Sequence, residues 1–247
     1  DWTSTNVQNG GKLLLENANV NLGGWDSYLY VQGGGTLEMS GGSLYSWGGL
    51  RTRSNGAASL VGVEVKSSVS NEGSTELEGT THTAAITNSG TLAMQGVTST
   101  SSVQNTGSLT ARNVTLGGYL DSRGTAALEN VSCATLYVDS VEDVVTTGTG
   151  VTMTSDEVFR LYDFSGGVDG LLDSMVWIAT STGDKYIGLY GSFGDTTLNA
   201  LPLSFAGGYK MTGSVTVKSG ATVTLAEGEC IGRTGSRQYL DINGTLE

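Results

Sequence analysis

Few residues in this chain are of the types that catalysis or metal binding requires. The single histidine, His82, lies in the stretch TTHTAAI, and the two cysteines, Cys133 and Cys230, are far apart in the sequence. A structural zinc site needs four ligands of these types at close spacing, and a hydrolase triad needs a nucleophile on a sharp turn near a histidine. Neither pattern occurs. We therefore predict no catalytic residues, and we expect His82 to be a structural residue at an inward or corner position.

Carboxylates in one segment are the other candidates for chemistry. They are Asp156, Glu157, Asp163, Asp169 and Asp173. Glycosidases use paired carboxylates at a set separation, and polysaccharide lyases use acids that bind calcium beside a base. Arg160 is the only base nearby, and the NTD, DD and HG signatures of polygalacturonases are missing. We interpret these acids as solvated loop residues of a chain that is not an enzyme.

Calcium is the one cofactor that the segment leaves open. Asp163, Asp169 and Asp173 in DFSGGVDGLLD are the candidates for its ligands. Their spacing matches no EF-hand loop. No other cofactor or metal is predicted.

Composition indicates which elements must position these residues. The chain has 38 Gly and 1 Pro, and its charged fraction of 15% is well below the roughly 25% of average globular chains. An excess of Gly, Ser, Thr and Asn is typical of many short strands joined by tight turns. The net charge of −12 comes without a basic stripe, which excludes a nucleic-acid partner. No apolar run is long enough to span a membrane, so no membrane insertion is expected.

A repeat of 17 residues organises the middle of the chain. Glycines recur at this spacing at 56, 73, 90, 107 and 124, and apolar residues between them alternate with period two. This alternation predicts strands, about three in each repeat, and we expect the glycines to supply turns with φ > 0. Such a unit buries its inner face only by stacking on copies of itself, at about 4.8 Å per coil. One inward column falls seven places after the glycines and includes Val63, Val97, Val114 and Val131.

One polar column shares the parity of the buried residues. Asn71, Asn88 and Asn105 each lie two places before a repeat glycine, and Asn9 has the same place in the first coil. Stacked amides hydrogen-bond one another along the axis of such an assembly. We therefore predict an asparagine ladder at a corner.

Three tryptophans form a second column. Trp2, Trp25 and Trp47 precede Gly11, Gly35 and Gly56 by nine, ten and nine residues. One interpretation is an aromatic ladder that fills or caps the wider N-terminal end. The other is an exposed platform for sugar rings, since nearby glycines in GGWDSYLY and YSWGGL put the rings near turns.

The pattern divides the chain into three parts. Residues 1–148 are predicted to be a β-helix whose 17-residue repeats are clearest at 52–135. Residues 149–205 are predicted to be an irregular β transition or wider coils, and 206–247 the start of a second β-helix segment. Because the last residues repeat a mid-coil phrase, we expect the chain to be part of a longer array.

The stretch YKMTGSVTVKSGATVTL, with the later YLDINGTL, carries a resemblance to a known class. It is similar to the opening coils of large secreted bacterial right-handed parallel β-helix proteins, which include adhesin-like surface proteins and autotransporter passengers. The matching positions are Tyr209, Gly213, Val215, Val217, Gly220, Val223, Leu225, Leu240, Gly244 and Leu246. The resemblance implies the architecture and an extracellular location on a bacterial surface. It brings no catalytic residue to this chain.

The sequence therefore predicts an all-β fold, a right-handed parallel β-helix, or β-solenoid, with coils of about 17–24 residues. The period alone also allows left-handed winding, which the broken hexapeptide pattern disfavours. The expected function is a non-catalytic stalk or adhesin segment that presents a binding face, with a cell-surface or matrix polysaccharide as the partner. A polysaccharide lyase or glycosidase and a carbohydrate-binding β-helix remain alternatives.

Overall fold

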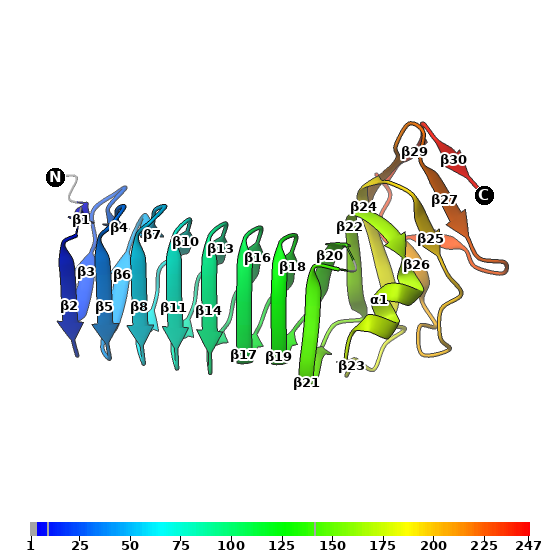
Figure 1. Ribbon diagram of the computed structural model, residues 1–247. Helices are drawn as coiled ribbons and strands as arrows, with labels where there is room; N and C mark the ends of the chain where they lie inside the picture. Colours follow the sequence, from blue (N-terminus) through cyan, green and yellow to red (C-terminus); the bar gives the residue numbers. More distant parts are fainter. Residues whose placement is uncertain (1–3, 9, 141) are drawn as a thin grey trace.

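A computed structural model describes residues 4–8, 10–140 and 142–247. The chain forms a parallel β-solenoid of about 11 turns, with 59% of its residues in strands and one short helix. Figure 1 shows the coils stacked along one axis from the N-terminal end to β21, where α1 and wider coils follow. The predicted all-β parallel β-helix is confirmed.

Each regular coil has three strands, and each strand pairs in parallel with its equivalents in the neighbouring coils. The first strands form a ladder that we call the first-strand sheet. It contains β1 (Thr5–Val7), β4 (Tyr28–Val31), β7 (Gly49–Thr52), β10 (Val69–Asn71), β13 (Ile86–Asn88), β16 (Val103–Asn105), β18 (Leu120–Ser122), β20 (Leu136–Ser140), β22 (Glu157–Gly167), β24 (Tyr186–Phe193), β26 (Gly208–Val217) and β28 (Ile231–Arg233).

The second and third strands of the regular coils form a separate sheet. Its second strands are β2 (Lys12–Glu16), β5 (Thr36–Ser40), β8 (Ala57–Val61), β11 (Ser74–Glu78) and β14 (Thr91–Gln95). Its third strands are β3 (Asn19–Leu22), β6 (Ser43–Ser46), β9 (Glu64–Val65), β12 (Thr81–His82) and β15 (Thr98–Ser99). In the next coils one long strand replaces both, as β17 (Ser108–Leu116), β19 (Thr125–Cys133) and β21 (Val144–Met153), and β23 (Trp177–Ala179) pairs with the last of these.

Residues that are 17 positions apart in the sequence pair in neighbouring strands of the ladder. Leu92 pairs with Leu109, and Val114 pairs with Val131. Val97 and Val114 are each 1% exposed, as expected for an inward column. Like residues therefore lie above like residues, and the core is one continuous strip along the axis.

The asparagine ladder is confirmed at a corner of the coil for Asn71, Asn88 and Asn105, while Asn9 lies outside the described residues. The Nδ2 group of Asn71 donates to Oδ1 of Asn88 at 2.6 Å, and Nδ2 of Asn88 donates to Oδ1 of Asn105 at 2.7 Å. Each amide also donates to a backbone carbonyl of the following coil, as Asn88 does to Ser108 at 3.0 Å. These bonds satisfy buried polar groups that would otherwise destabilise the stack.

The role expected for the repeat glycines is wrong. The glycines at 56, 73, 90, 107 and 124 do not have positive φ. They are needed because the backbone of the preceding coil is too close for a side chain. A Cβ on Gly90 would lie 2.2 Å from the carbonyl oxygen of Gly73.

Left-handed backbone occurs instead at the turn between the second and third strands. It forms a column through eight coils, made of Asn17, Gly41, Gly62, Gly79, Gly96, Asn113, Asn130 and Gly148, with φ between 50° and 63°. Gly and Asn are the residues that adopt this conformation at low cost. Asn113 and Asn130 lie inside β17 and β19 and hydrogen-bond each other at 3.0 Å.

The coils widen after β21. Helix α1 (Val168–Ser174) follows β22 and buries Val168 and Leu171. The core here is aromatic, with Phe159, Phe164 and Phe193 fully buried. Large rings fill a wider cross-section, which explains why the 17-residue period is lost in 149–205.

Backbone pairing continues across residue 206, where the sequence predicts a second segment to begin. In the first-strand sheet, Ile187 of β24 pairs with Tyr209 of β26. A further ladder joins β25 (Thr196–Leu198), β27 (Thr222–Leu225) and β30 (Thr245–Leu246), and β29 (Leu240–Ile242) pairs with β26. The C-terminal coils thus extend the same stack.

Candidate functional site

The tryptophan column is confirmed for the two members that the structure describes. Trp25 and Trp47 lie in the turns after β3 and β6, with ring centroids 4.8 Å apart and an interplanar angle of 24°. Trp2 lies outside the described residues. The centroid separation matches the spacing of parallel strands, so the rings stack along the solenoid axis.

Both rings are exposed, so they do not fill the wider end of the solenoid. The exposed fractions are 74% for Trp25 and 54% for Trp47. Each ring gives one face to the other, which leaves the ring edges for a ligand. Ser27 joins the turn that carries Trp25 to the turn that carries Trp47. Its carbonyl oxygen accepts from the backbone N–H of Gly48 at 2.7 Å and from the hydroxyl of Ser46 at 2.5 Å.

The acids predicted as calcium or catalytic candidates do not converge. Oδ1 of Asp163 accepts from the backbone N–H of Ser192 at 2.5 Å, while Asp169 and Asp173 are exposed on α1. Oε1 of Glu157 accepts from Nε of Arg160 at 2.7 Å. Over residues 4–8, 10–140 and 142–247, no group of three or more metal-ligating side chains is positioned to hold an ion.

His82 is buried, as the sequence predicts. It is 1% exposed, and its Nε2 lies 2.9 Å from the hydroxyl oxygen of Thr80. Burial lowers its pKa from 6.5 to about 4, so the ring is neutral at physiological pH. Within the described residues its Nδ1 has no hydrogen-bond partner.

The outer face of the first-strand sheet carries aromatic and cationic side chains that sequence reasoning missed. In one stack, Tyr119 and Tyr137 have centroids 4.6 Å apart and planes within 7°. The Arg160 guanidinium lies over Tyr137 at 4.3 Å, and Gln104 donates to the Tyr119 hydroxyl at 3.2 Å. Four side chains from four different strands or turns therefore follow one another along the axis.

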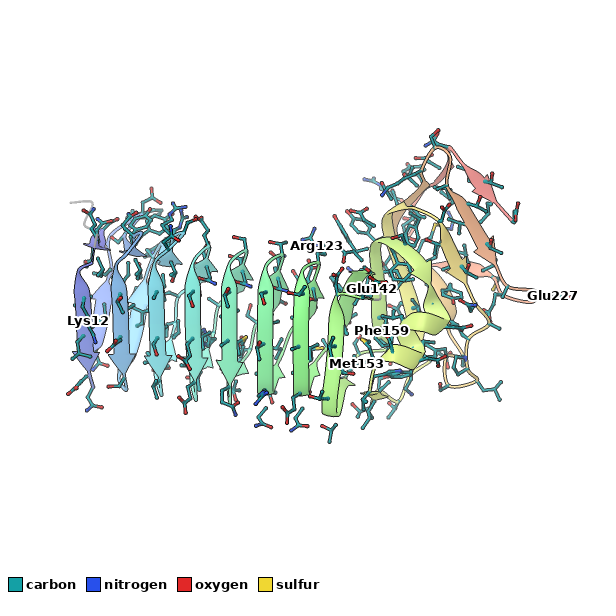
Figure 2. All side chains as sticks on the ribbon, in the orientation of Figure 1. Lys12, Arg123, Glu142, Met153, Phe159 and Glu227 are labelled. Carbon is teal, nitrogen blue, oxygen red and sulfur yellow. The ribbon has the colours of Figure 1, made fainter. Side chains whose placement is uncertain are left out.

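A second stack lies beside the first. The Arg123 guanidinium is 4.9 Å from the ring centroid of Tyr162, and the rings of Tyr162 and Tyr190 are 5.0 Å apart. Two nitrogens of Arg123 donate to the two oxygens of Asp121, each at 3.1 Å. We call the tyrosine rings and guanidinium groups of these two stacks the C-terminal wall, and Gln104 lies at its foot. Arg123 is labelled in Figure 2, where it projects from the surface of the stack.

The N-terminal coils have a matching group on the same sheet, which we call the N-terminal wall. Arg51 lies over the Tyr28 ring at 4.1 Å and donates to its hydroxyl at 3.0 Å. Arg53 lies over Tyr30 at 5.7 Å and forms an ion pair with Glu72 at 2.6 Å. Cation–π contacts of this kind hold long side chains in fixed positions.

A hollow of about 220 Å³ separates the two walls. It is lined by Ser70, Asn71, Glu72, Thr87, Asn88, Ser89, Gln104, Thr106 and Arg123. Glu72 belongs to the N-terminal wall and Arg123 to the C-terminal wall, while uncharged polar side chains form the floor. Figure 2 shows long side chains gathered on the N-terminal coils and on the C-terminal part, with shorter ones between.

Perturbed pKa values gather at the C-terminal wall. Burial raises the pKa of Asp121, against the opposing effect of Arg123, and burial raises the pKa of Tyr137 to about 12. The pKa of Asp139 is raised by burial and then by repulsion from Asp143. Such clusters mark candidate functional sites as well as structural ion-pair networks.

In the part of the chain that the structure describes, no helix has the length and hydropathy needed to cross a membrane. Comparison of the chain with protein-family models, with curated proteins and with solved structures finds no significant match.

Proposed function

We propose that this chain is a non-catalytic, extracellular stalk or adhesin segment of a larger bacterial surface protein. The observation that supports this function best is the uninterrupted parallel ladder, which joins consecutive coils from β1 to β28 in the first-strand sheet. Each coil pairs with its neighbours through backbone hydrogen bonds, so the assembly is stiff along its length. A stiff rod spans distance and presents long outer faces, which suits attachment.

The arrangement of the reactive residues favours binding over catalysis. Glu157 is paired with Arg160, Asp163 anchors a backbone N–H, and His82 is enclosed in the core. A glycosidase needs two carboxylates that face each other across a substrate. The exposed aromatic side chains are instead suited to contact with a surface polysaccharide.

A panel of plant, bacterial and matrix polysaccharides tests this proposal. Binding by the purified chain and release of new reducing ends or unsaturated products are measured on the same samples, with calcium and with chelator. Binding without turnover is expected. Turnover that Glu157→Gln abolishes would overturn the non-catalytic assignment.

The tryptophan pair is a second candidate for the binding element, because both rings are exposed at fixed spacing. Trp25→Ala and Trp47→Ala are compared with Leu203→Ala, which removes a fully exposed apolar side chain elsewhere. If the pair contacts sugar, the two tryptophan variants lose glycan binding and the leucine variant keeps it. Equal binding by all three would exclude the pair.

A further inference from the structure

We propose that the hollow between the two walls binds an uncharged oligosaccharide that lies along the solenoid axis. This inference deepens the proposed function, because it names a ligand class and a place for it on the rod. We call the hollow and its two walls the saddle. None of the acids of 156–173 lines the hollow, although Glu157 pairs with Arg160 of the C-terminal wall. The floor of the hollow lies two to four coils beyond the tryptophan pair.

The floor of the saddle presents hydrogen-bonding groups at a fixed spacing. Ser70 of β10 pairs with Thr87 of β13, and Thr87 pairs with Gln104 of β16, so these side chains form one outward row. Successive members are about 4.8 Å apart. A row of hydroxyl and amide groups donates and accepts, as a row of sugar hydroxyls does.

The walls fix the length of the ligand. Glu72 follows β10 and Arg123 follows β18, three coils further along the first-strand sheet. Three coil spacings are about 14 Å, which is the length of a short oligosaccharide and not of a single sugar. Arg53 and Arg123 stand at the two ends, and each packs on a tyrosine ring behind it, Tyr30 and Tyr162 respectively.

The polar groups of the walls are held in place before a ligand arrives. Arg123 is bound by both oxygens of Asp121 and packs on Tyr162, while Arg53 is bound by Glu72 and packs on Tyr30. A guanidinium has five N–H donors, and these ion pairs leave several of them for a ligand. Preorganised groups lose little conformational entropy when they bind.

The ion pairs of the walls and the net charge of the chain favour an uncharged ligand. Arg53, Arg123 and Arg160 each have a carboxylate partner, and the fourth arginine of the walls, Arg51, packs on the Tyr28 ring and donates to its hydroxyl. The whole chain carries a net charge of −12, which repels polyanions such as uronate or sulfated chains. A neutral hexose or pentose oligomer complements this surface.

Substitutions on the floor test the saddle. Thr87 is exposed on the first-strand sheet, inside the hollow, and Thr110 is exposed on the second-strand face, outside it. The variants Thr87→Tyr and Thr110→Tyr therefore make the same substitution at a test site and at a control site. Both sites favour β-branched or aromatic residues, which keeps the fold intact. A second variant, Gln104→Ala, removes one polar group of the floor without filling it.

The full chain is titrated by calorimetry with neutral tri- and tetrasaccharides of glucose, mannose, galactose and xylose, and with uronate and sulfated oligosaccharides. At least one neutral oligosaccharide is expected to bind, and its Kd should be the same at low and at high salt. Thr87→Tyr should raise that Kd at least tenfold and Gln104→Ala severalfold, while Thr110→Tyr leaves it unaltered.

Three results would overturn the saddle. The first is that only acidic oligosaccharides bind, the second is that no oligosaccharide binds, and the third is that Thr87→Tyr and Thr110→Tyr bind neutral sugar equally. If Trp25→Ala alone abolishes binding, the adhesin proposal survives and the saddle does not. Turnover of polysaccharide would instead sink the proposed non-catalytic function, whichever surface binds.

Discussion

Val114 shows what a single inward residue contributes to a stacked fold. It is 1% exposed and lies between Val97 of the preceding coil and Val131 of the next. We predict that Val114→Asp destabilises the chain by at least about 3 kcal/mol, because a carboxyl group enters an apolar column with no partner. For a chain of this size that is roughly 6–12 °C in Tm, measured by circular dichroism.

Thr115 is the matched control for this substitution. It follows Val114 in β17 but is exposed, and it pairs with Thr98 and Ser132 on the outer face. Thr115→Asp should change Tm by only a few degrees, because its charge stays in water. Equal losses for the two variants would contradict the inward and outward assignment.

His82 makes the stability of the stack depend on pH. Its pKa is about 4 in the folded chain against 6.5 for an unperturbed group. The unfolded chain therefore takes up this proton first as the pH falls, and folded stability decreases between pH 6.5 and 4. At pH 5 we expect a loss of about 2 kcal/mol relative to pH 7.5 that is due to this residue.

A leucine at this position isolates the effect. Ser99 pairs with both His82 and Leu116, so leucine already occupies the same inward column two coils away. Urea unfolding of the wild type and of His82→Leu is compared at pH 7.5 and pH 5. The variant should lose less stability on acidification, and identical pH dependence would show that His82 titrates normally in the folded chain.

At the scale of the coil, two glycine columns have different physical roles and respond differently to alanine. A Cβ on Gly90 meets the carbonyl oxygen of Gly73 at 2.2 Å, whereas a Cβ on Gly79 has no atom within 4 Å but stands on a backbone with φ of 58°. We predict that Gly90→Ala costs about 2–4 kcal/mol and Gly79→Ala about 1 kcal/mol, measured by urea unfolding.

Asparagine at position 79 is the control for this comparison. Asn113 and Asn130 hold the left-handed position in later coils, so Gly79→Asn should be close to neutral. If Gly79→Asn destabilised the chain as much as Gly90→Ala, the roles assigned to the two glycine columns would be wrong.

These columns also show how far the sequence alone predicts the fold. The period of the repeat predicts which residues pair, since Asn71, Asn88 and Asn105 do stack. It does not predict why a glycine is needed, because steric contact between coils and positive φ both select glycine. Asn113 and Asn130 are the sequence signal for the position with positive φ, because they take the place of glycine there in two coils.

The walls of the saddle lay beyond sequence reasoning for a related reason. Tyr119, Tyr137 and Arg160 come from coils of unequal length, and the pairing of β20 with β22 shifts register after Val138. No fixed period therefore aligns these residues. The tryptophan pair was predictable because Trp25 and Trp47 keep nearly constant distances from the next glycine.

For the whole molecule, the sequence predicts a second segment from residue 206, and backbone pairing runs across that position. The pattern changes because α1 and buried rings such as Phe159 and Phe193 widen the coils. The parallel ladder continues through β24 and β26, because it depends on backbone hydrogen bonds and not on the identity of the side chains. Side-chain patterns thus report coil width better than they report the continuity of a solenoid.

Continuity of this kind predicts that a whole coil is removable. Leu92 and Leu109 are equivalent, so deletion of residues 92–108 joins Thr91 to Leu109 and keeps every later residue in register. Because each coil contacts only its neighbours, the shortened chain should fold with a single melting transition within a few degrees of the wild type. Asn88 would then meet Ser122, which accepts from Asn105 in the intact ladder at 3.4 Å.

A deletion that is one residue shorter provides the control. Removing 93–108 leaves two leucines side by side in one strand, so the residues after them turn to the opposite face or form a bulge. This chain should melt well below the in-register deletion. The in-register deletion also removes Gln104 from the floor of the saddle and brings the walls closer by about 4.8 Å. It should therefore keep the fold of the rod and lose binding of the neutral oligosaccharide, which separates the scaffold from the site that it carries.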